Sequence, residues 1–186
     1  MHTNITINNE DFSIYISEKE IQERVRELGE EMNKRYEGKT PIFIGVLNGS
    51  FIFFADLLRE ITIDCEVDFL KLSSYGDSKI SSGNVTLLKD LNCQITGRDI
   101  VLVEDIIDSG LSIDYIRKLV LAQSPKSLAV AALLYKKEAI KIHNPIEYIG
   151  FEIPNDFVIG YGLDYDQQGR QLRDIYTVCD DIETVK

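Results

Sequence analysis

Acidic and hydroxyl-bearing residues crowd one short segment of this sequence, between positions 104 and 112. Glu104 and Asp105 are adjacent, and Asp108 adds a third carboxylate three residues after Asp105. The small residues that follow suit a phosphate, because backbone N–H groups at a helix start attract anions and glycine allows close approach. A phosphate cradle beside carboxylates that can bind hydroxyls and magnesium predicts a site for a phosphorylated sugar. The predicted cradle uses the amides of Asp108, Ser109, Gly110 and Ser112 and the two serine hydroxyls.

The residues around this segment predict how it is positioned. Ile100 to Val103 is a short apolar run with branched side chains, which is typical of a buried strand. After Gly110 the apolar residues recur with a helical period, so we expect a helix over residues 112–123. The segment then forms a turn between a strand and a helix N-terminus. A simpler interpretation stays open, in which the acidic residues only cap the helix, with Asp108 or Ser109 as the N-cap.

The rest of the chain alternates between strand and helix patterns, which predicts an α/β fold with a mostly parallel sheet covered by helices on both faces. Ser17 and Glu20 form a capping box, and a helix is expected from there to about Tyr36. A second helix is expected over 51–59, and the polar stretch 73–84 is expected to be a long mobile loop. Strands are expected over residues 41–47, 63–69, 85–88, 100–103, 127–134, 146–153, 157–159 and 175–178.

Four groups of polar residues follow apolar strands of the predicted sheet. They are the pair Asn48-Gly49, the acidic segment 104–108, the pair Lys136-Lys137, and Asp164. Ligands of open α/β sheets bind beyond the carboxyl ends of the strands. We therefore expect these groups, although remote in sequence, to converge at one mouth.

Length and composition limit the classes of function. The 186 residues suit a single domain, and a net charge of −11 argues against binding to a nucleic acid backbone. No apolar run approaches the ~20 residues that cross a bilayer, and the first residues lack the pattern of a signal peptide. Cys65, Cys93 and Cys179 lie far apart, so neither a disulfide framework nor a zinc site is expected. These features favour the cytoplasm and no membrane partner.

The string Val101 to Ser112 resembles the phosphoribosyl pyrophosphate signature of the type I phosphoribosyltransferases: an apolar strand, two acidic residues, two apolar residues, Asp, a hydroxyl residue, Gly and a second hydroxyl residue. With this string as the anchor, nearly the whole chain resembles the hypoxanthine-guanine phosphoribosyltransferases. The resemblance implies a central, mostly parallel twisted sheet flanked by helices, with a small hood lobe. It implies one domain over residues 1–186, whose hood comes from the N-terminal segment and the region after about residue 150.

Two loops of the family are matched before the signature. Leu47 to Ser50 resembles the loop that contacts pyrophosphate, which in the family commonly holds a non-proline cis peptide; this implies that Asn48 and Gly49 bind substrate. Asn48 departs from the lysine that many members carry, whereas the backbone at Gly49 can still serve. Ser74 and Tyr75 resemble the start of the loop that closes over the active site in the family.

Other matches follow the signature. Lys136 matches the lysine that donates to the purine O6, and an ammonium, which only donates, suits a 6-oxopurine. Phe157 matches the ring that stacks on the base, and the backbone of Val158 matches the group that reads the base edge. Asp164 matches a magnesium ligand, and Arg170 matches an arginine that contacts pyrophosphate.

The resemblance implies transfer of the 5-phosphoribosyl group from phosphoribosyl pyrophosphate to N9 of hypoxanthine or guanine, which forms IMP or GMP and pyrophosphate. Asp108 is then the general base at N7, while Glu104 and Asp105 bind the ribose hydroxyls and, with Asp164, hold Mg²⁺. A homodimer or homotetramer is also implied. The residues implied to hold the 5′-phosphate are Ser109, Gly110, Leu111 and Ser112.

Three alternatives stay open. The first is a phosphoribosyltransferase for another base, such as xanthine, adenine or a pyrimidine. Lys136 and Phe157 argue for 6-oxopurines, but side chains say little about the purine 2-position, which separates hypoxanthine, guanine and xanthine. The second is a non-catalytic regulator that senses the sugar pyrophosphate, although the acidic chain shows no nucleic-acid-binding face. The third is a phospho-acceptor signalling domain, which Glu104-Asp105 and Lys136 after their strands superficially imitate. The phosphate cradle counts against this last one.

Overall fold

The computed structural model describes residues 4–74 and 85–179, which form two β-sheets and three α-helices. The large sheet has the strand order β5-β4-β3-β6-β7-β8, and the small sheet has the order β1-β2-β10-β9. The strands are β1 (Ile5–Ile7), β2 (Glu10–Ile16), β3 (Ile42–Leu47), β4 (Glu66–Ser74), β5 (Val85–Lys89), β6 (Asp99–Ile107), β7 (Ser127–Tyr135), β8 (Tyr148–Glu152), β9 (Val158–Ile159) and β10 (Ile175–Val178). The helices are α1 (Glu18–Arg35), α2 (Phe51–Glu60) and α3 (Leu111–Leu121), with one short 3-10 turn at Lys137–Ala139.

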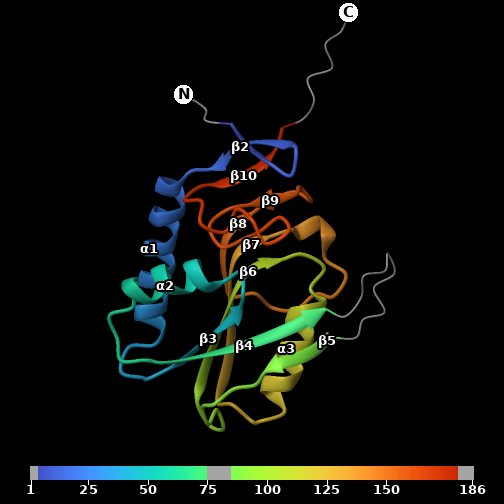
Figure 1. Cartoon of the computed structure of the whole chain (residues 1–186). Helices are drawn as coiled ribbons and strands as arrows, with labels where there is room; N and C mark the ends of the chain where they lie inside the picture. Colours follow the sequence, from blue (N-terminus) through green and yellow to red (C-terminus); the bar gives the residue numbers. More distant parts are fainter. Residues whose placement is uncertain (1–3, 75–84, 180–186) are drawn as a thin grey trace, which may run out of the picture.

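Strands β4, β3, β6, β7 and β8 run parallel, and β5 pairs with β4 antiparallel, so the predicted mostly parallel sheet is confirmed. Figure 1 shows α1 and α2 on one side of this sheet and α3 on the other. The apolar faces of the helices explain this arrangement, because α1 and α2 share one buried cluster with the sheet and α3 contributes to a second cluster. The capping box predicted at Ser17 is present: Ser17 Oγ accepts from the Glu20 amide, and the Glu20 carboxylate accepts from the Ser17 amide.

The small sheet brings together the N-terminal segment and the C-terminal part of the described chain. Strand β2 pairs with β10, which pairs in turn with β9. The β1–β2 hairpin turns at Asn8 and Asn9, both with positive φ, a conformation that Asn tolerates better than most residues. Figure 1 places this sheet beyond the end of the large sheet at which β6 and β7 terminate.

Two of the predicted strands differ by three or more residues from their sequence-based boundaries. Strand β6 was expected to end at Val103, but it continues through Ile107, because pairing with β7 extends to Ile107 and Tyr135. Strand β4 begins at Glu66 rather than at residue 63, because Glu66 is the residue that pairs with Ile42 at the start of β3. Within residues 4–74 and 85–179, no helix is both long and apolar enough to cross a membrane.

Candidate active site

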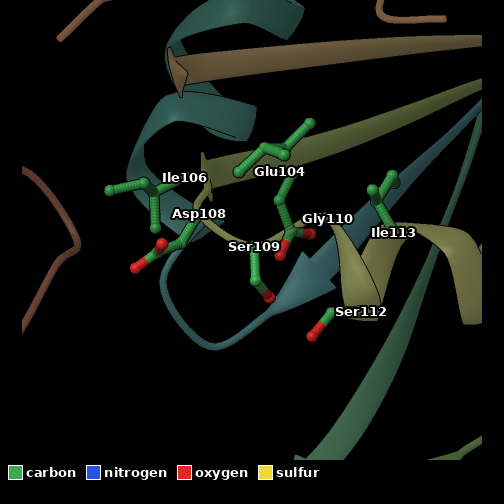
Figure 2. Close-up of a pocket in the computed structure, with 8 residues that line it drawn as sticks. Glu104, Ile106, Asp108, Ser109, Gly110, Ser112 and Ile113 are labelled. Carbon is green, nitrogen blue, oxygen red and sulfur yellow. The ribbon is translucent and has the colours of Figure 1, made fainter. Parts of the chain in front are cut away.

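A small cavity of about 80 Å³ lies where β6 passes into α3. Figure 2 shows the Glu104 carboxylate and the Ser109 hydroxyl directed to the side of Ser112, whereas the Asp108 carboxylate points away from them. Five of the predicted site residues line the cavity, and four of them come from the segment between β6 and α3 and from the start of α3. The lining consists of Glu104, Ile106, Ile107, Asp108, Ser109, Gly110, Ser112 and Ile113.

The backbone of this turn leaves its amides available. In the described part of the chain, the amides of Asp108, Ser109, Gly110 and Ser112 donate no hydrogen bond to another protein group. The carbonyls are used instead: Ser109 accepts from the amide of Lys141 at 3.0 Å, and Gly110 from that of Asp114 at 3.0 Å. A set of free amides beside a helix N-terminus is the arrangement that binds phosphate oxygens.

The capping interpretation is wrong in detail. The N-cap of α3 is Gly110, with φ of 80° and no side-chain cap, rather than Asp108 or Ser109. A side chain at this position would be strained by the positive φ, and its Cβ would lie 2.6 Å from the carbonyl oxygen of Ile142. The helix therefore begins without a capping side chain at its N-cap. Leu111 is its first residue.

Asp108 and Lys136 are paired across the ends of two neighbouring strands. The Nζ atom of Lys136 lies 3.5 Å from Asp108 Oδ2, and the Lys136 amide donates to the Ile107 carbonyl at 3.0 Å. Lys136 is buried, whereas 56% of the Asp108 side chain is exposed. The pair thus presents one accessible acceptor beside a fixed donor. Lys137, by contrast, is exposed and pairs with Glu152.

Glu104 carries an unsatisfied buried atom. Its Oε2 is inaccessible to solvent and has no hydrogen-bond partner among the described residues. Burial, with a smaller contribution from the charge of Asp105, raises the pKa of Glu104 well above its usual range. An unpaired polar atom in such a place is typical of a group that meets a ligand.

Asp105 faces a different part of the site from Glu104, because successive strand residues point to opposite faces. Burial raises the pKa of Asp105 to about 6, an effect that the charge of Asp164 increases and that the Arg170 guanidinium opposes. A Cβ added at Gly49 would overlap the Asp105 carboxylate, so only glycine fits beside it. Gly49 belongs to the turn after β3, whose Leu47–Asn48 peptide bond is cis, as the resemblance implied.

Asp164 and Arg170 form an ion pair close to Asp105. Arg170 Nη2 lies 2.7 Å from Asp164 Oδ1, and Arg170 Nη1 donates to the Gly162 carbonyl at 2.8 Å. The second oxygen of Asp164 accepts from the Gln167 amide at 2.8 Å. A Cβ at Gly162 would overlap the Gly49 carbonyl, which shows how closely the two loops pack.

The remaining predicted residues are placed less fully. The Phe157 ring is 45% exposed and packs edge-on against Tyr165 at a centroid distance of 5.2 Å, while Val158 is buried in β9. No hydrogen bond or ion pair between described residues joins Phe157 or Val158 to the Asp108–Lys136 pair. Ser74 ends β4 opposite Val85, and Tyr75 lies outside the described residues.

The predicted convergence is therefore observed for all four groups. Gly49 packs against Asp105, and Asp108 forms an ion pair with Lys136. The charges of Asp164 and Arg170 act on the pKa of Asp105. Sequence patterns do not mark the apolar lining of the cavity, since Ile106, Ile107 and Ile113 are typical of strand and helix core residues. No motif marks Gln167 either; its backbone amide donates a hydrogen bond to Asp164 Oδ2.

The donor set suits magnesium. Mg²⁺ takes oxygen ligands and is usually held by one or two carboxylates together with substrate phosphates and water, rather than by a complete protein cage. In the described ranges no three His, Cys, Asp or Glu side chains gather as a ready-made metal site. The raised pKa of Asp105 and its proximity to Asp164 nevertheless describe two oxygen donors that a cation would stabilise.

Comparison with known proteins gives consistent results. A family model described as a phosphoribosyl transferase domain matches residues 15–166. The hypoxanthine-guanine phosphoribosyltransferase of Bacillus subtilis is 45% identical over 86% of this chain and 88% of its own length. The bifunctional protein TilS/HprT of Listeria monocytogenes is 43% identical over 91% of this chain, which spans only 26% of that protein. A crystal structure of a hypoxanthine-guanine phosphoribosyltransferase from Bacillus anthracis superposes with a TM-score of 0.85 at 42% identity, covering 89% of this chain and 98% of that one.

Proposed function

The chain belongs to the phosphoribosyltransferase family and has its type I fold, and from this we propose that it is a purine salvage enzyme. The proposed reaction moves the 5-phosphoribosyl group of phosphoribosyl pyrophosphate to N9 of hypoxanthine, and of guanine, with release of pyrophosphate. The products are IMP and GMP. The relatives named for this activity, which this chain matches over most of its length, support the choice of substrate.

The 5′-phosphate occupies the cavity at the start of α3 in this proposal. Its oxygens accept from the free amides of the turn, and the hydroxyls of Ser109 and Ser112 supply further donors. The positive end of the helix dipole adds to the attraction. Glu104, whose Oε2 lacks a protein partner, accepts from a ribose hydroxyl.

The base lies against Asp108 and Lys136. Lys136 donates to O6 of the purine, and Asp108 takes the proton from N7 as N9 bonds to C1′. The buried position of Lys136 and the exposed carboxylate of Asp108 support these roles. The exposed ring of Phe157 stacks on the base, and the Val158 backbone reads its edge.

Asp105 and Asp164 would hold Mg²⁺, and Arg170 and the Gly49 backbone would bind the diphosphate. When bound, the cation neutralises charge on the departing pyrophosphate. The carboxylates of this chain favour the positive charge that develops on the sugar, and the two loops hold the substrates face to face. The mutual approach of Gly49, Asp105 and Gly162 supports this assignment.

The organisation of the molecule is part of the proposal. Residues 1–186 form one domain, and the small sheet of β1, β2, β9 and β10 forms the hood over the site. A cytoplasmic location and an assembly of two or four copies follow from the family. The three cysteines are free, in agreement with a reducing compartment.

The observation that carries the proposal is the set of free amides around the cavity, with the Asp108–Lys136 pair beside it. The experiment supplies phosphoribosyl pyrophosphate, Mg²⁺ and, separately, hypoxanthine, guanine, xanthine, adenine and uracil, and measures nucleotide formation. We expect IMP and GMP. Formation of AMP or UMP alone would identify a different base specificity, and ligand binding without any product would indicate a non-catalytic sensor.

A further inference from the structure

The Asp164–Arg170 ion pair joins two groups to which the proposed function assigns different ligands. Asp164 is the proposed cation ligand and Arg170 the proposed diphosphate donor, yet each is bonded to the other at 2.7 Å. Both side chains are largely shielded, with exposures of 25% and 21%. A charge-assisted bond in such surroundings is stronger than a bond between fully exposed charges.

Each partner is also held by neighbouring protein groups in this arrangement. Asp164 uses its Oδ1 for Arg170 and its Oδ2 for the Gln167 amide. Arg170 Nη2 faces Asp164 and also donates to Gln167 Oε1 at 3.4 Å, and Nη1 donates to the Gly162 carbonyl. A cation on Asp164 Oδ1 would lie beside the Arg170 guanidinium, and a diphosphate on Arg170 Nη2 would lie beside the Asp164 carboxylate. Repulsion between like charges therefore favours separation of the pair when either ligand binds.

We infer that this ion pair is an internal placeholder that couples cation binding to diphosphate binding. A cation on Asp164 releases Arg170 for the diphosphate, and a diphosphate on Arg170 releases Asp164 for the cation. Thermodynamic linkage requires the coupling to be the same in both directions. The inference rests on the proposed function, because it takes Asp164 and Arg170 as the ligand-binding groups.

The coupling is tested by binding alone, with each ligand in the absence of the other. Pyrophosphate is titrated calorimetrically in EDTA into the wild type and Asp164→Asn. Mn²⁺ is titrated, with its EPR signal as the readout, into the wild type and Arg170→Gln. Each substitution removes one partner of the pair, so the remaining group should bind its ligand about five-fold or more tightly than in the wild type.

Two neighbouring residues provide controls for a simple change of net charge. Asp166→Asn removes an exposed carboxylate from the same turn. Arg173→Gln removes a guanidinium that pairs with Glu18 at 2.6 Å and is 77% exposed. Neither control breaks the placeholder pair, so affinities should stay within about two-fold of the wild type.

Two outcomes would overturn the inference. Equal effects of Asp164→Asn and Asp166→Asn on pyrophosphate, together with equal effects of Arg170→Gln and Arg173→Gln on Mn²⁺, would show that only net charge matters. That result leaves the proposed function standing, since the wild type still forms nucleotide. Failure of the wild type both to bind pyrophosphate with Mg²⁺ present and to form nucleotide would overturn the inference and the proposed function together.

Discussion

Asp108 is the residue on which the proposed chemistry depends most. Its carboxylate is exposed, turns away from the phosphate cavity and lies 3.5 Å from the ammonium of Lys136. A purine placed against both groups would accept a hydrogen bond from Lys136 and give up one proton to Asp108. The phosphate and the base then bind on different sides of one short turn.

Replacement of Asp108 by Asn should lower turnover on the order of 10²–10⁴-fold, because the amide keeps the shape of the side chain but cannot accept the N7 proton. Steady-state kinetics with hypoxanthine measure this effect. Asp64→Asn, which removes an exposed carboxylate outside the site, is the control and should be neutral. Turnover near the wild-type value in Asp108→Asn would remove the general-base assignment.

Lys136 should set the preference for 6-oxopurines. Lys136→Gln offers both a donor and an acceptor in place of an ammonium, so the ratio of kcat/KM for hypoxanthine to that for adenine should fall. The matched control is Lys137→Gln, since Lys137 is adjacent in sequence but exposed. An unchanged ratio in Lys136→Gln would reject the role of this residue.

Gly49 tests the contact between the two loops. Its Cβ would overlap the Asp105 carboxylate, so Gly49→Ala should displace that side chain and lower kcat/KM on the order of 10²-fold. Gly97→Asn is the control, because a Cβ there meets open space and Asn tolerates its φ of 70°. Equal activity of the two variants would contradict the contact assigned to Gly49 and Asp105.

At the scale of elements, Asp68 on β4 fixes the segment that leads from β5 to β6. Its carboxylate accepts from the amides of Phe69, Asn92 and Cys93 at 2.6–2.9 Å, and Lys89 Nζ lies at 3.2 Å. Burial alone would raise the pKa of Asp68, but these bonds together hold it well below its usual range. The ionised form is therefore the one that stabilises the fold.

Asp68→Asn should reduce the free energy of unfolding by about 1–3 kcal/mol at neutral pH, because an amide nitrogen would face backbone donors. The pKa of Asp68 is lower in the folded than in the unfolded chain, where it is about 3.9. The stabilisation is therefore complete above the unfolded value and is lost as the pH falls through the folded value. Urea unfolding from pH 7 to pH 3 measures the difference between wild type and variant, which should shrink toward acid. A difference of zero at pH 7, or one that grows toward acid, would contradict this account.

Local sequence signals predicted an element well where interactions between near neighbours in the sequence determine it. The capping box at Ser17 and the apolar stripe after it gave α1 almost to the residue. The boundaries of β4 and β6 were wrong because long-range pairing sets them: β7 extends β6 past two carboxylates that would end an isolated strand. Asp68 alternates with apolar residues in the predicted strand 63–69, a pattern that places it on the solvent face, but its hydrogen bonds allow it to be buried.

At the scale of the whole molecule, the strand alternation predicted the large sheet and the edge at which the site lies. The pairing of β2 with β10, more than 150 residues apart, has no local signal and needs the structure. The same limit applies to the site, whose residues were named from the motif and the family resemblance. The pairing of Asp164 with Arg170 and the fit of Gly49 against Asp105 depend on loops that meet only after folding.

In the proposed complex, the turn after β6 holds the 5′-phosphate on its free amides while Asp108 and Lys136 face the base. A crystal structure of this protein with IMP and Mg²⁺ tests it most directly. We expect phosphate oxygens within hydrogen-bond distance of the amides of Ser109, Gly110 and Ser112, with N7 beside Asp108 and O6 beside Lys136. A phosphate bound elsewhere, or a purine out of reach of Asp108, would contradict it.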